Sequence, residues 1–123
     1  MSAVLNYLRA CALGDLPDVG ALQVKLQGVT VAVVRDEHGT VHAVADTCSH
    51  AAVSLSEGEV DDCSIECWLH GSRFDLVTGE PLALPAIRPI PVYPVSIEGD
   101  DVLVDVTTTT GAAPPEALAV KES

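Results

Sequence analysis

Short alternations of apolar and polar residues, separated by turn residues, dominate this chain. Over Ala21–Leu26 the apolar side chains alternate with Gln23 and Lys25, which is the period of a strand with one buried face. A weaker alternation predicts a first strand around Leu8–Leu13, and Val29–Arg35 is a run of β-branched residues typical of strands.

The first half of the chain turns back on itself where these runs end. Gln27-Gly28 separates the second run from the third, and Asp36–Gly39 separates the third from Val41–Asp46. Gly39 suits a hairpin because glycine adopts a positive φ without strain. We therefore expect an antiparallel meander that delivers Cys48 just past the end of a strand.

The second half has shorter patterns and is rich in proline. Short strands are expected at three places: Glu59–Val60, Ser64–Glu66 and Arg73–Leu76. Five prolines between positions 81 and 94 exclude a helix or a central strand, so this stretch should form a stiff loop and then an edge strand. The runs Val92–Ile97 and Val102–Val106 predict a closing hairpin.

The composition agrees with a small β-sheet protein in one domain. The chain has 123 residues, of which 48% are hydrophobic and only 3% aromatic, enough for one modest core. No apolar run reaches the length of a membrane span, and the first residues lack the basic region of a signal peptide. We therefore expect a cytoplasmic protein without membrane association, in which the four cysteines are ligands or reduced thiols.

The chain is strongly acidic, with a net charge of −12. Such a surface repels nucleic acid and anionic membranes, and it favours fast encounter with basic protein partners. Solubility alone explains the charge equally well.

Two pairs of ligand-type residues stand in the middle of the chain. Cys48 and His50 form a C-x-H pair, Cys67 and His70 form a C-x-x-H pair, and sixteen residues separate the pairs. On two facing loops they can hold a [2Fe–2S] cluster, with both thiolates on one iron and both imidazoles on the other. Zinc is the alternative, because two cysteines and two histidines satisfy a tetrahedral ion. Zinc fingers commonly pair Cys with Cys and His with His, so the mixed pairs favour iron and sulfide.

The residues around these pairs resemble the Rieske [2Fe–2S] proteins. Gly71-Ser72 after the last ligand, the Asp75–Gly79 turn and the prolines at 85–94 are similar to that family's cluster-binding subdomain. Residues 5–106 as a whole resemble the small soluble Rieske ferredoxins. The resemblance implies an all-β fold: an antiparallel β-sandwich with a small cluster-binding β subdomain.

The same resemblance implies a division of the chain and a role for each ligand. Residues 1–106 would form a single domain, with the cluster-binding subdomain at about 46–90, and residues 107–123 a flexible tail. By this resemblance both cysteines hold the inner iron, and both histidines hold the outer iron near solvent. The ligands are Cys48, His50, Cys67 and His70.

The resemblance further implies a one-electron carrier, not an enzyme, that passes electrons from a flavin reductase to a terminal oxygenase. A Rieske oxygenase needs a second domain with a mononuclear iron on two histidines and a carboxylate. The chain is too short for that, and only His38 and His42 remain outside the pairs. A Suf-type role in iron–sulfur cluster assembly is the alternative pathway, and a zinc-stabilised interaction module is a further alternative. Nitrite reductase small subunits resemble the fold but lack the ligands.

Departures from the high-potential members of the family predict a reduction potential at the low end of the Rieske range. Val53 and Leu69 stand where those proteins carry a disulfide, and Phe74 replaces a tyrosine that donates to a ligand sulfur. Ser72 matches a serine that donates to a bridging sulfide, which argues mildly for a higher potential. Carboxylates between the ligand pairs disfavour adding an electron: Glu57, Glu59, Asp61, Asp62 and Glu66.

The remaining candidates have simpler interpretations. Cys11 and Cys63 are expected to be buried or unused thiols. His38 lies in a turn and His42 on a strand, and both are expected on the surface. Trp68 is expected to shield the cluster from water.

Overall fold

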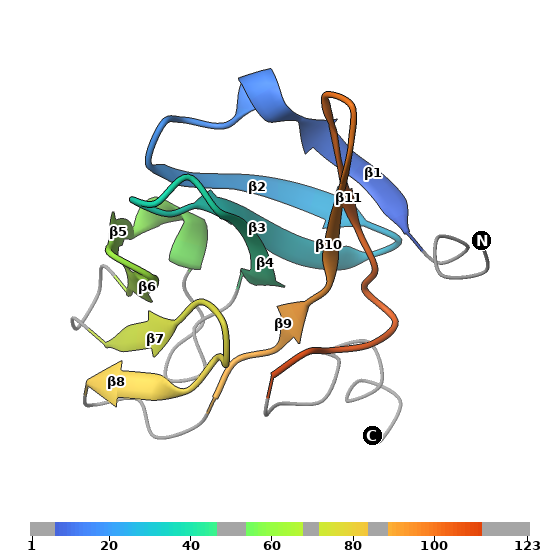
Figure 1. The fold of residues 1–123 in the computed structure, drawn as a ribbon. Helices are drawn as coiled ribbons and strands as arrows, with labels where there is room; N and C mark the ends of the chain where they lie inside the picture. Colours follow the sequence, from blue (N-terminus) through green and yellow to red (C-terminus); the bar gives the residue numbers. More distant parts are fainter. Residues whose placement is uncertain (1–6, 47–53, 68–71, 84–88, 112–123) are drawn as a thin grey trace.

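Three antiparallel sheets make up the part of the chain that the computed structural model describes, residues 7–46, 54–67, 72–83 and 89–111 (Figure 1). Their strand orders are β1-β11-β10, β2-β3-β4-β9 and β5-β6-β7-β8. The strands are β1 (Leu8–Ala12), β2 (Gly20–Leu26), β3 (Val29–Arg35), β4 (Val41–Ala45), β5 (Glu59–Asp61), β6 (Ser64–Glu66), β7 (Arg73–Asp75), β8 (Pro81–Ala83), β9 (Val92–Tyr93), β10 (Val95–Glu98) and β11 (Asp101–Val104). Two short 3₁₀ turns are η2 (Leu13–Asp15) and η3 (Leu55–Glu57). The expected all-β fold is confirmed.

The expected meander is formed by β2, β3 and β4, which pair in sequence order. The tight turn between β2 and β3 places Gln27 and Gly28 at positive φ, and Gly39 takes a positive φ of 85° in the next turn. The first strand is not part of this meander. β1 pairs instead with β11, the last strand of the chain, so the first half of the sequence alone does not complete either sheet.

Strand β3 is buried on both faces, which explains its continuous apolar run. Val31 and Val33 lie in a core between the first two sheets, while Ala32 and Val34 lie in a second core. That second core also contains side chains of the third sheet and of η3: Leu55, Ile65, Cys67, Phe74 and Leu76. The central sheet thus packs against the sheet β1-β11-β10 on one face and the third sheet, β5-β6-β7-β8, on the other; we call the third sheet the cluster-binding sheet, because the sequence predicts the ligand pairs next to it.

The predicted strand Val92–Ile97 is wrong as a single element. Pro94 interrupts it, because proline cannot donate to a sheet ladder. β9 before it pairs with β4 at the edge of the central sheet, and β10 after it pairs with β11. The chain therefore crosses from one sheet to another at Pro94, whose carbonyl oxygen accepts a hydrogen bond from the Asp105 amide at 3.2 Å.

After β11 the described residues first contribute Val106 to the core between the first two sheets and then return to β9. The Thr110 amide donates to the carbonyl oxygen of Val92 at 2.8 Å. Residues 112–123 lie outside the described part, so the flexible tail stays a prediction. Within the described ranges no helix has the length and apolarity that a membrane crossing would require.

We predict that Gly58→Ala destabilises the cluster-binding sheet. A Cβ at this position would collide with the backbone carbonyl of Glu66, and the backbone of β6 cannot yield as a flexible side chain would. Overpacking of this kind costs roughly 1–3 kcal/mol. Urea unfolding monitored by circular dichroism measures the loss, and Gly14→Ala is the matched control because nothing lies within 4 Å of a Cβ there. Equal stability of the two variants would contradict the close approach.

Candidate metal centre

Cys67 is the one predicted ligand that lies in the described part of the chain. It follows β6 directly and is fully buried, in the same apolar cluster as Leu55 and Phe74. Cys48, His50 and His70 fall in the segments 47–53 and 68–71, outside the described residues, as do Val53, Trp68 and Leu69. Their assignment as ligands stays a prediction.

Asp46 joins the two ends of segment 47–53, which contains the first predicted ligand pair. We call such joined ends the base of a segment. Asp46 ends the path of β4 and is buried, with 1% of its surface exposed. Its backbone carbonyl accepts from the Leu55 amide at 2.6 Å, and its Oδ1 accepts from the Ser56 amide at 2.7 Å. The Gln23 side-chain amide donates to Oδ2 at 2.5 Å. These hydrogen bonds therefore join Asp46, just before segment 47–53, to Leu55 and Ser56, which follow it.

A single backbone hydrogen bond closes the base of the second segment. The Cys67 amide donates to the carbonyl oxygen of Ser72 at 2.6 Å. On either side of this bond β6 and β7 pair, with Glu66 opposite Arg73. The residues on both sides of segment 68–71 are thus fixed by this hydrogen bond and by the pairing of β6 with β7. Ser72, expected to donate to a sulfide, is fully buried at this position.

The two bases lie on the same apolar cluster. Leu55, which follows the first segment, and Cys67, which precedes the second, belong to one buried group. A thiolate at Cys67 would be shielded from water on the protein side, which suits a ligand of the inner iron in a Rieske site. The donor set in the sequence, one thiol and one imidazole on each segment, fits the same cofactor.

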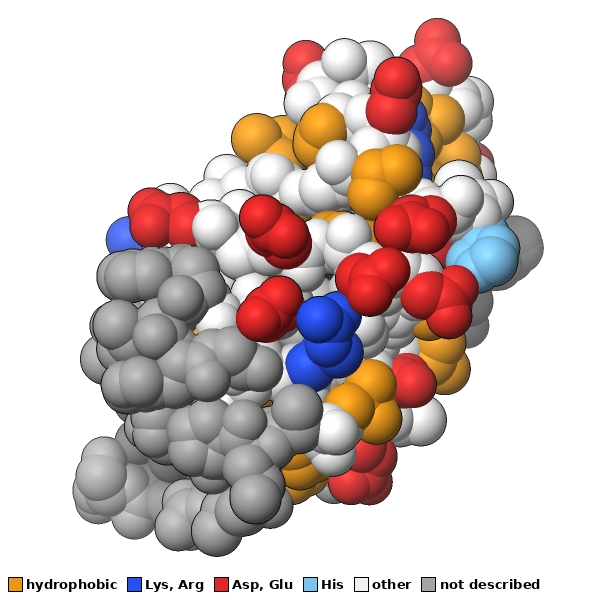
Figure 2. Space-filling model, turned by 90° about the vertical axis from the view of Figure 1, so that its left-hand side faces the viewer, with side chains coloured by type: hydrophobic (Ala, Val, Ile, Leu, Met, Phe, Trp, Pro, Cys, Tyr) orange, Lys and Arg blue, Asp and Glu red, His pale blue; other side chains and the backbone are white. Residues whose placement is uncertain are grey.

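Acidic side chains gather on the face of the cluster-binding sheet, around a basic one (Figure 2). Arg73 lies 3.5 Å from Asp61 and 3.3 Å from Glu66. We call this the β5–β6 acidic surface, defined by Glu57, Glu59, Asp61, Asp62 and Glu66. Arg73 compensates only part of its negative charge. In the sequence this surface lies between the two ligand segments: Glu57 follows the first segment and Glu66 precedes the second.

A cluster of three ligand-type side chains, Asp36, His42 and the partly exposed Cys63, lies beside this surface, and the sequence did not indicate it. His42 was expected on the surface, but its side chain is only 10% exposed, and its Nε2 lies 2.7 Å from Oδ2 of Asp36. Cys63 donates its thiol to the same oxygen at 3.2 Å. The expectation for His42 was wrong because its neighbours in the third sheet cover this end of β4. His38 is exposed as expected, and it pairs with Asp62.

Protonation within this cluster is set by the buried carboxylate. Burial alone would raise the pKa of Asp36, but hydrogen bonds from His42, Cys63 and the amides of Thr40 and His38 outweigh it and hold that pKa well below its usual range. The hydrogen bond to Asp36, and then burial, raise the pKa of the Cys63 thiol to about 11. Cys63 is therefore a thiol at neutral pH, not a reactive thiolate.

Comparisons with known proteins agree with this geometry. Residues 6–94 match the Rieske [2Fe–2S] domain family. The chain is 39% identical over 103 residues, 83% of this chain and 95% of the relative, to the 3-phenylpropionate/cinnamic acid dioxygenase ferredoxin subunit of Escherichia coli K12. Among solved structures it resembles the ferredoxin of carbazole 1,9a-dioxygenase from Nocardioides aromaticivorans IC177, with a TM-score of 0.76, 37% identity and coverage of 80% of this chain and 96% of that one.

A further solved structure shows a related ferredoxin with its partner. It is a complex of reduced oxygenase and oxidised ferredoxin in carbazole 1,9a-dioxygenase, with a TM-score of 0.75, 35% identity and coverage of 81% of this chain and 93% of that one. The chain therefore belongs to the Rieske [2Fe–2S] domain family. The comparisons confirm two expectations from the sequence. These are the cofactor of that family, a [2Fe–2S] cluster, and the function of an electron carrier.

We predict that Asp46→Ala weakens retention of the cluster. The change leaves the Ser56 amide and the Gln23 side chain without their carboxylate partner, so the base of segment 47–53 loosens. Loss of a buried charged hydrogen-bond acceptor costs roughly 2–4 kcal/mol. Iron and acid-labile sulfide per chain should fall after purification, and the unfolding midpoint should fall with them.

Asp100→Ala is the matched control for this variant. Asp100 is an exposed carboxylate in the β10–β11 turn, away from both segments. Iron retained in Asp46→Ala at the level of this control would show that the carboxylate does not support the site.

Proposed function

We propose that this protein is the ferredoxin component of a ring-hydroxylating dioxygenase system, which accepts one electron from a flavin reductase and delivers it to a terminal oxygenase. Its relatives named above are dioxygenase ferredoxins, and this supports the dioxygenase pathway over a role in cluster assembly. The observation that carries the proposal is that the hydrogen-bonded ends of both segments contribute to one apolar cluster, in which Cys67, at the second of them, is fully buried. We further propose a carrier without catalytic activity of its own, in one domain over residues 1–106.

We assign the ligands as the sequence predicted. Cys48 and Cys67 would hold the inner iron, and His50 and His70 the outer iron. The bound cluster supplies reversible one-electron transfer. The protein excludes water on the Cys67 side through Leu55, Phe74 and their neighbours, while the histidine pair would offer the route by which a partner approaches.

We propose a reduction potential in the lower part of the Rieske range, which spans about −150 to +300 mV. Phe74 is fully buried beside Cys67 in one apolar cluster, and a phenylalanine has no hydroxyl to donate to sulfur. Fewer donors to sulfur stabilise the reduced cluster less. The carboxylates of the β5–β6 acidic surface act in the same direction, because they oppose added negative charge.

The β5–β6 acidic surface is proposed as the region that steers the partners. It adjoins both ligand segments in sequence, and its exposed carboxylates outnumber its one arginine. Complementary charges raise association rates, and salt screens the effect. The proposal therefore requires basic surfaces on the reductase and the oxygenase.

The experiment that tests the cofactor assignment is low-temperature EPR of the dithionite-reduced protein, with iron and zinc quantified on the same sample. We expect a rhombic signal with a low average g value and two irons per chain. A silent spectrum with one zinc per chain would replace the electron carrier by a zinc-stabilised module.

Cys67→Ser should abolish the signal, whereas His70→Cys should lower the potential or abolish the cluster. An unchanged spectrum and potential in His70→Cys would remove His70 from the ligand set.

We predict that Glu57→Lys/Glu59→Lys slows electron delivery. Both carboxylates are exposed and lie between the two ligand segments, so reversing them weakens attraction to a basic partner. The rate measured by stopped flow at low salt should fall roughly tenfold or more, and its salt dependence should weaken. The acceptor is the oxygenase of the 3-phenylpropionate/cinnamic acid dioxygenase system, reduced through this protein.

Glu98→Lys/Asp100→Lys is the control with the same change in net charge. These residues lie at the β10–β11 turn, which points away from the cluster-binding sheet (Figure 1). An equal loss of rate in both double variants would assign the effect to net charge and not to this surface. Failure of the reduced protein to pass electrons to any ring-hydroxylating oxygenase would contradict the proposed pathway.

A further inference from the structure

Asp36, His42 and Cys63 bring a carboxylate oxygen, an imidazole nitrogen and a thiol sulfur to one point. Their ligand atoms all lie within 4.8 Å of one another. Both His42 and Cys63 are directed at the same atom, Oδ2 of Asp36, at 2.7 Å and 3.2 Å. None of the three belongs to the ligand pairs of the Rieske centre.

The backbone holds each of the three residues in place. Oδ1 of Asp36 accepts from the amides of His38 and Thr40 at 2.8 Å and 3.0 Å, so Oδ2 is left to face the other two groups. His42 is fixed in the ladder between β3 and β4, opposite Val34. Cys63 is held in the β5–β6 turn, where its carbonyl oxygen accepts from the Leu76 amide at 2.8 Å. A site whose ligands are already positioned loses little entropy on binding.

These donors suit zinc or a similar borderline divalent ion. Zinc takes thiolate sulfur at about 2.3 Å and imidazole nitrogen or carboxylate oxygen at about 2.0–2.2 Å, which places neighbouring ligand atoms roughly 3.3–3.7 Å apart in a tetrahedron. The two separations from Oδ2 of Asp36, 2.7 Å to His42 and 3.2 Å to Cys63, are shorter, as expected where protons and not an ion join the groups. A small outward movement of the imidazole and the thiol would admit the ion.

Charge balance is a second reason to expect an ion at this cluster. The Asp36 carboxylate is fully buried, and a buried charge requires compensation. A divalent ion on one carboxylate, one thiolate and a neutral imidazole makes a site without net charge. Binding would break the S–H bond of Cys63, form a metal–sulfur bond and release one proton to solvent, with no change of oxidation state.

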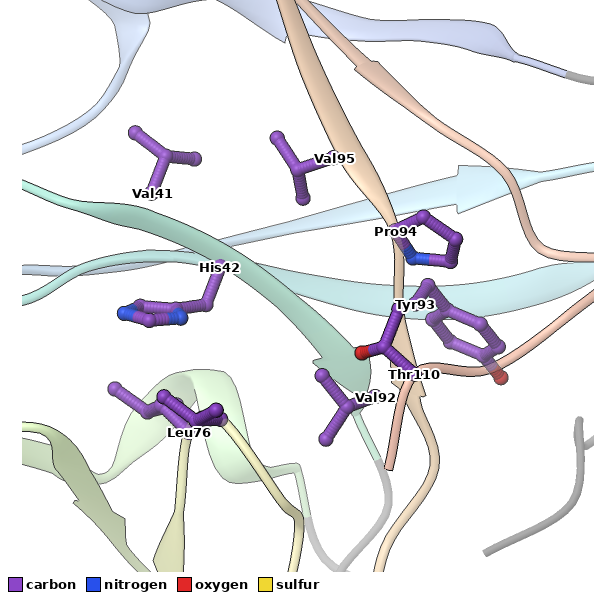
Figure 3. A pocket seen from close by; sticks show the side chains of 9 residues that line it. Val41, His42, Leu76, Val92, Tyr93, Pro94, Val95 and Thr110 are labelled. Atoms are coloured by element: carbon purple, nitrogen blue, oxygen red, sulfur yellow. The ribbon is translucent and has the colours of Figure 1, made fainter. Parts of the chain in front are cut away.

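Cys63 is the member of the cluster that solvent reaches. Its residue is partly exposed, whereas the side chains of Asp36 and His42 are 0% and 10% exposed. A groove of about 370 Å³ adjoins His42 and is lined by Leu76, Val77 and Val92 among others, and Figure 3 shows the imidazole at its wall. Asp36 and Cys63 do not line this groove, so an ion and a water as the fourth ligand would enter at Cys63.

We propose that Asp36, His42 and Cys63 form a second metal site, which takes zinc or a similar borderline divalent ion and is separate from the Rieske centre. The site joins the β3–β4 turn of the sandwich to the β5–β6 turn of the cluster-binding sheet. An ion bound there would tie the cluster-binding sheet to the sandwich through ligand bonds in place of hydrogen bonds.

The test adds zinc chloride to protein that carries its iron–sulfur cluster, followed by gel filtration and quantification of iron and zinc. We expect one zinc per chain with the iron content unchanged, and a higher unfolding temperature than without zinc. X-ray absorption at the zinc edge should show a single sulfur ligand at about 2.3 Å, with the others nitrogen or oxygen. Two sulfur ligands with loss of iron would place the zinc on the C-x-H and C-x-x-H pairs instead and overturn the proposal.

Cys63→Ser and His42→Gln are the test variants, and His38→Gln is the matched control. Each test variant removes one ligand and keeps Asp36 unchanged. Zinc binding should weaken by roughly tenfold or more. His38 lies in the same turn but is exposed and pairs with Asp62, so its loss should leave zinc binding unchanged. Cys63→Ser should also keep its full iron content.

Two further results would refute the second site. One is that no zinc remains on the cluster-loaded protein after gel filtration. The other is that Cys63→Ser binds zinc as tightly as the unchanged chain. Both are independent of the oxygenase assay, so the site can fail while the proposed electron-carrier function stands, and the reverse.

Discussion

The structure depends on two pairs of hydrogen-bonded residues that contribute to one apolar cluster. In the first, Asp46 accepts from the amides of Leu55 and Ser56, and in the second the Cys67 amide donates to Ser72. A two-iron centre needs ligands from both predicted pairs at a fixed separation. The sheets hold the chain in place immediately before and after segments 47–53 and 68–71, which contain three of the four predicted ligands.

Strand β3 is what allows one small chain to build both a sandwich and a cluster-binding sheet. Its alternate side chains enter two different cores, so the same strand packs against the outer sheet on one face and against the third sheet on the other. Pro94 has the complementary role. By ending β9 and starting β10 in another sheet, it lets a single chain segment border the central sheet and then complete the outer one.

Acidic residues have two distinct roles in this protein. Most are exposed, and those of the β5–β6 acidic surface give the cluster-binding face its charge. Asp36 and Asp46 are buried, with 1% of their surface exposed, and each accepts hydrogen bonds from backbone amides. A buried carboxylate is tolerated because such amides replace its hydration. Asp105 is buried as well and accepts from the Thr107 amide, so the net charge of −12 includes buried carboxylates that hold turns of the chain in place.

The sequence by itself determined the features that depend on local chemistry. The strands from Gly20 to Ala45, the glycine turns between them and the spacing of the two ligand pairs follow from side-chain period, β-branching and the φ freedom of glycine. The Rieske resemblance rested on the same local motifs, and it was confirmed. Four ligand residues could be named in this way, although only Cys67 lies within the described part of the chain.

The tertiary structure decided what depends on contacts between distant segments. The pairing of β1 with β11 and the switch of sheets at Pro94 join residues that no local pattern connects. The cluster of Asp36, His42 and Cys63 was missed for the same reason. Its members are separated by 6 and 27 positions from Asp36, with no metal-binding spacing, and two turns from different sheets must meet before their ligand atoms converge. Burial of His42 likewise comes from neighbours on the third sheet and not from its own strand.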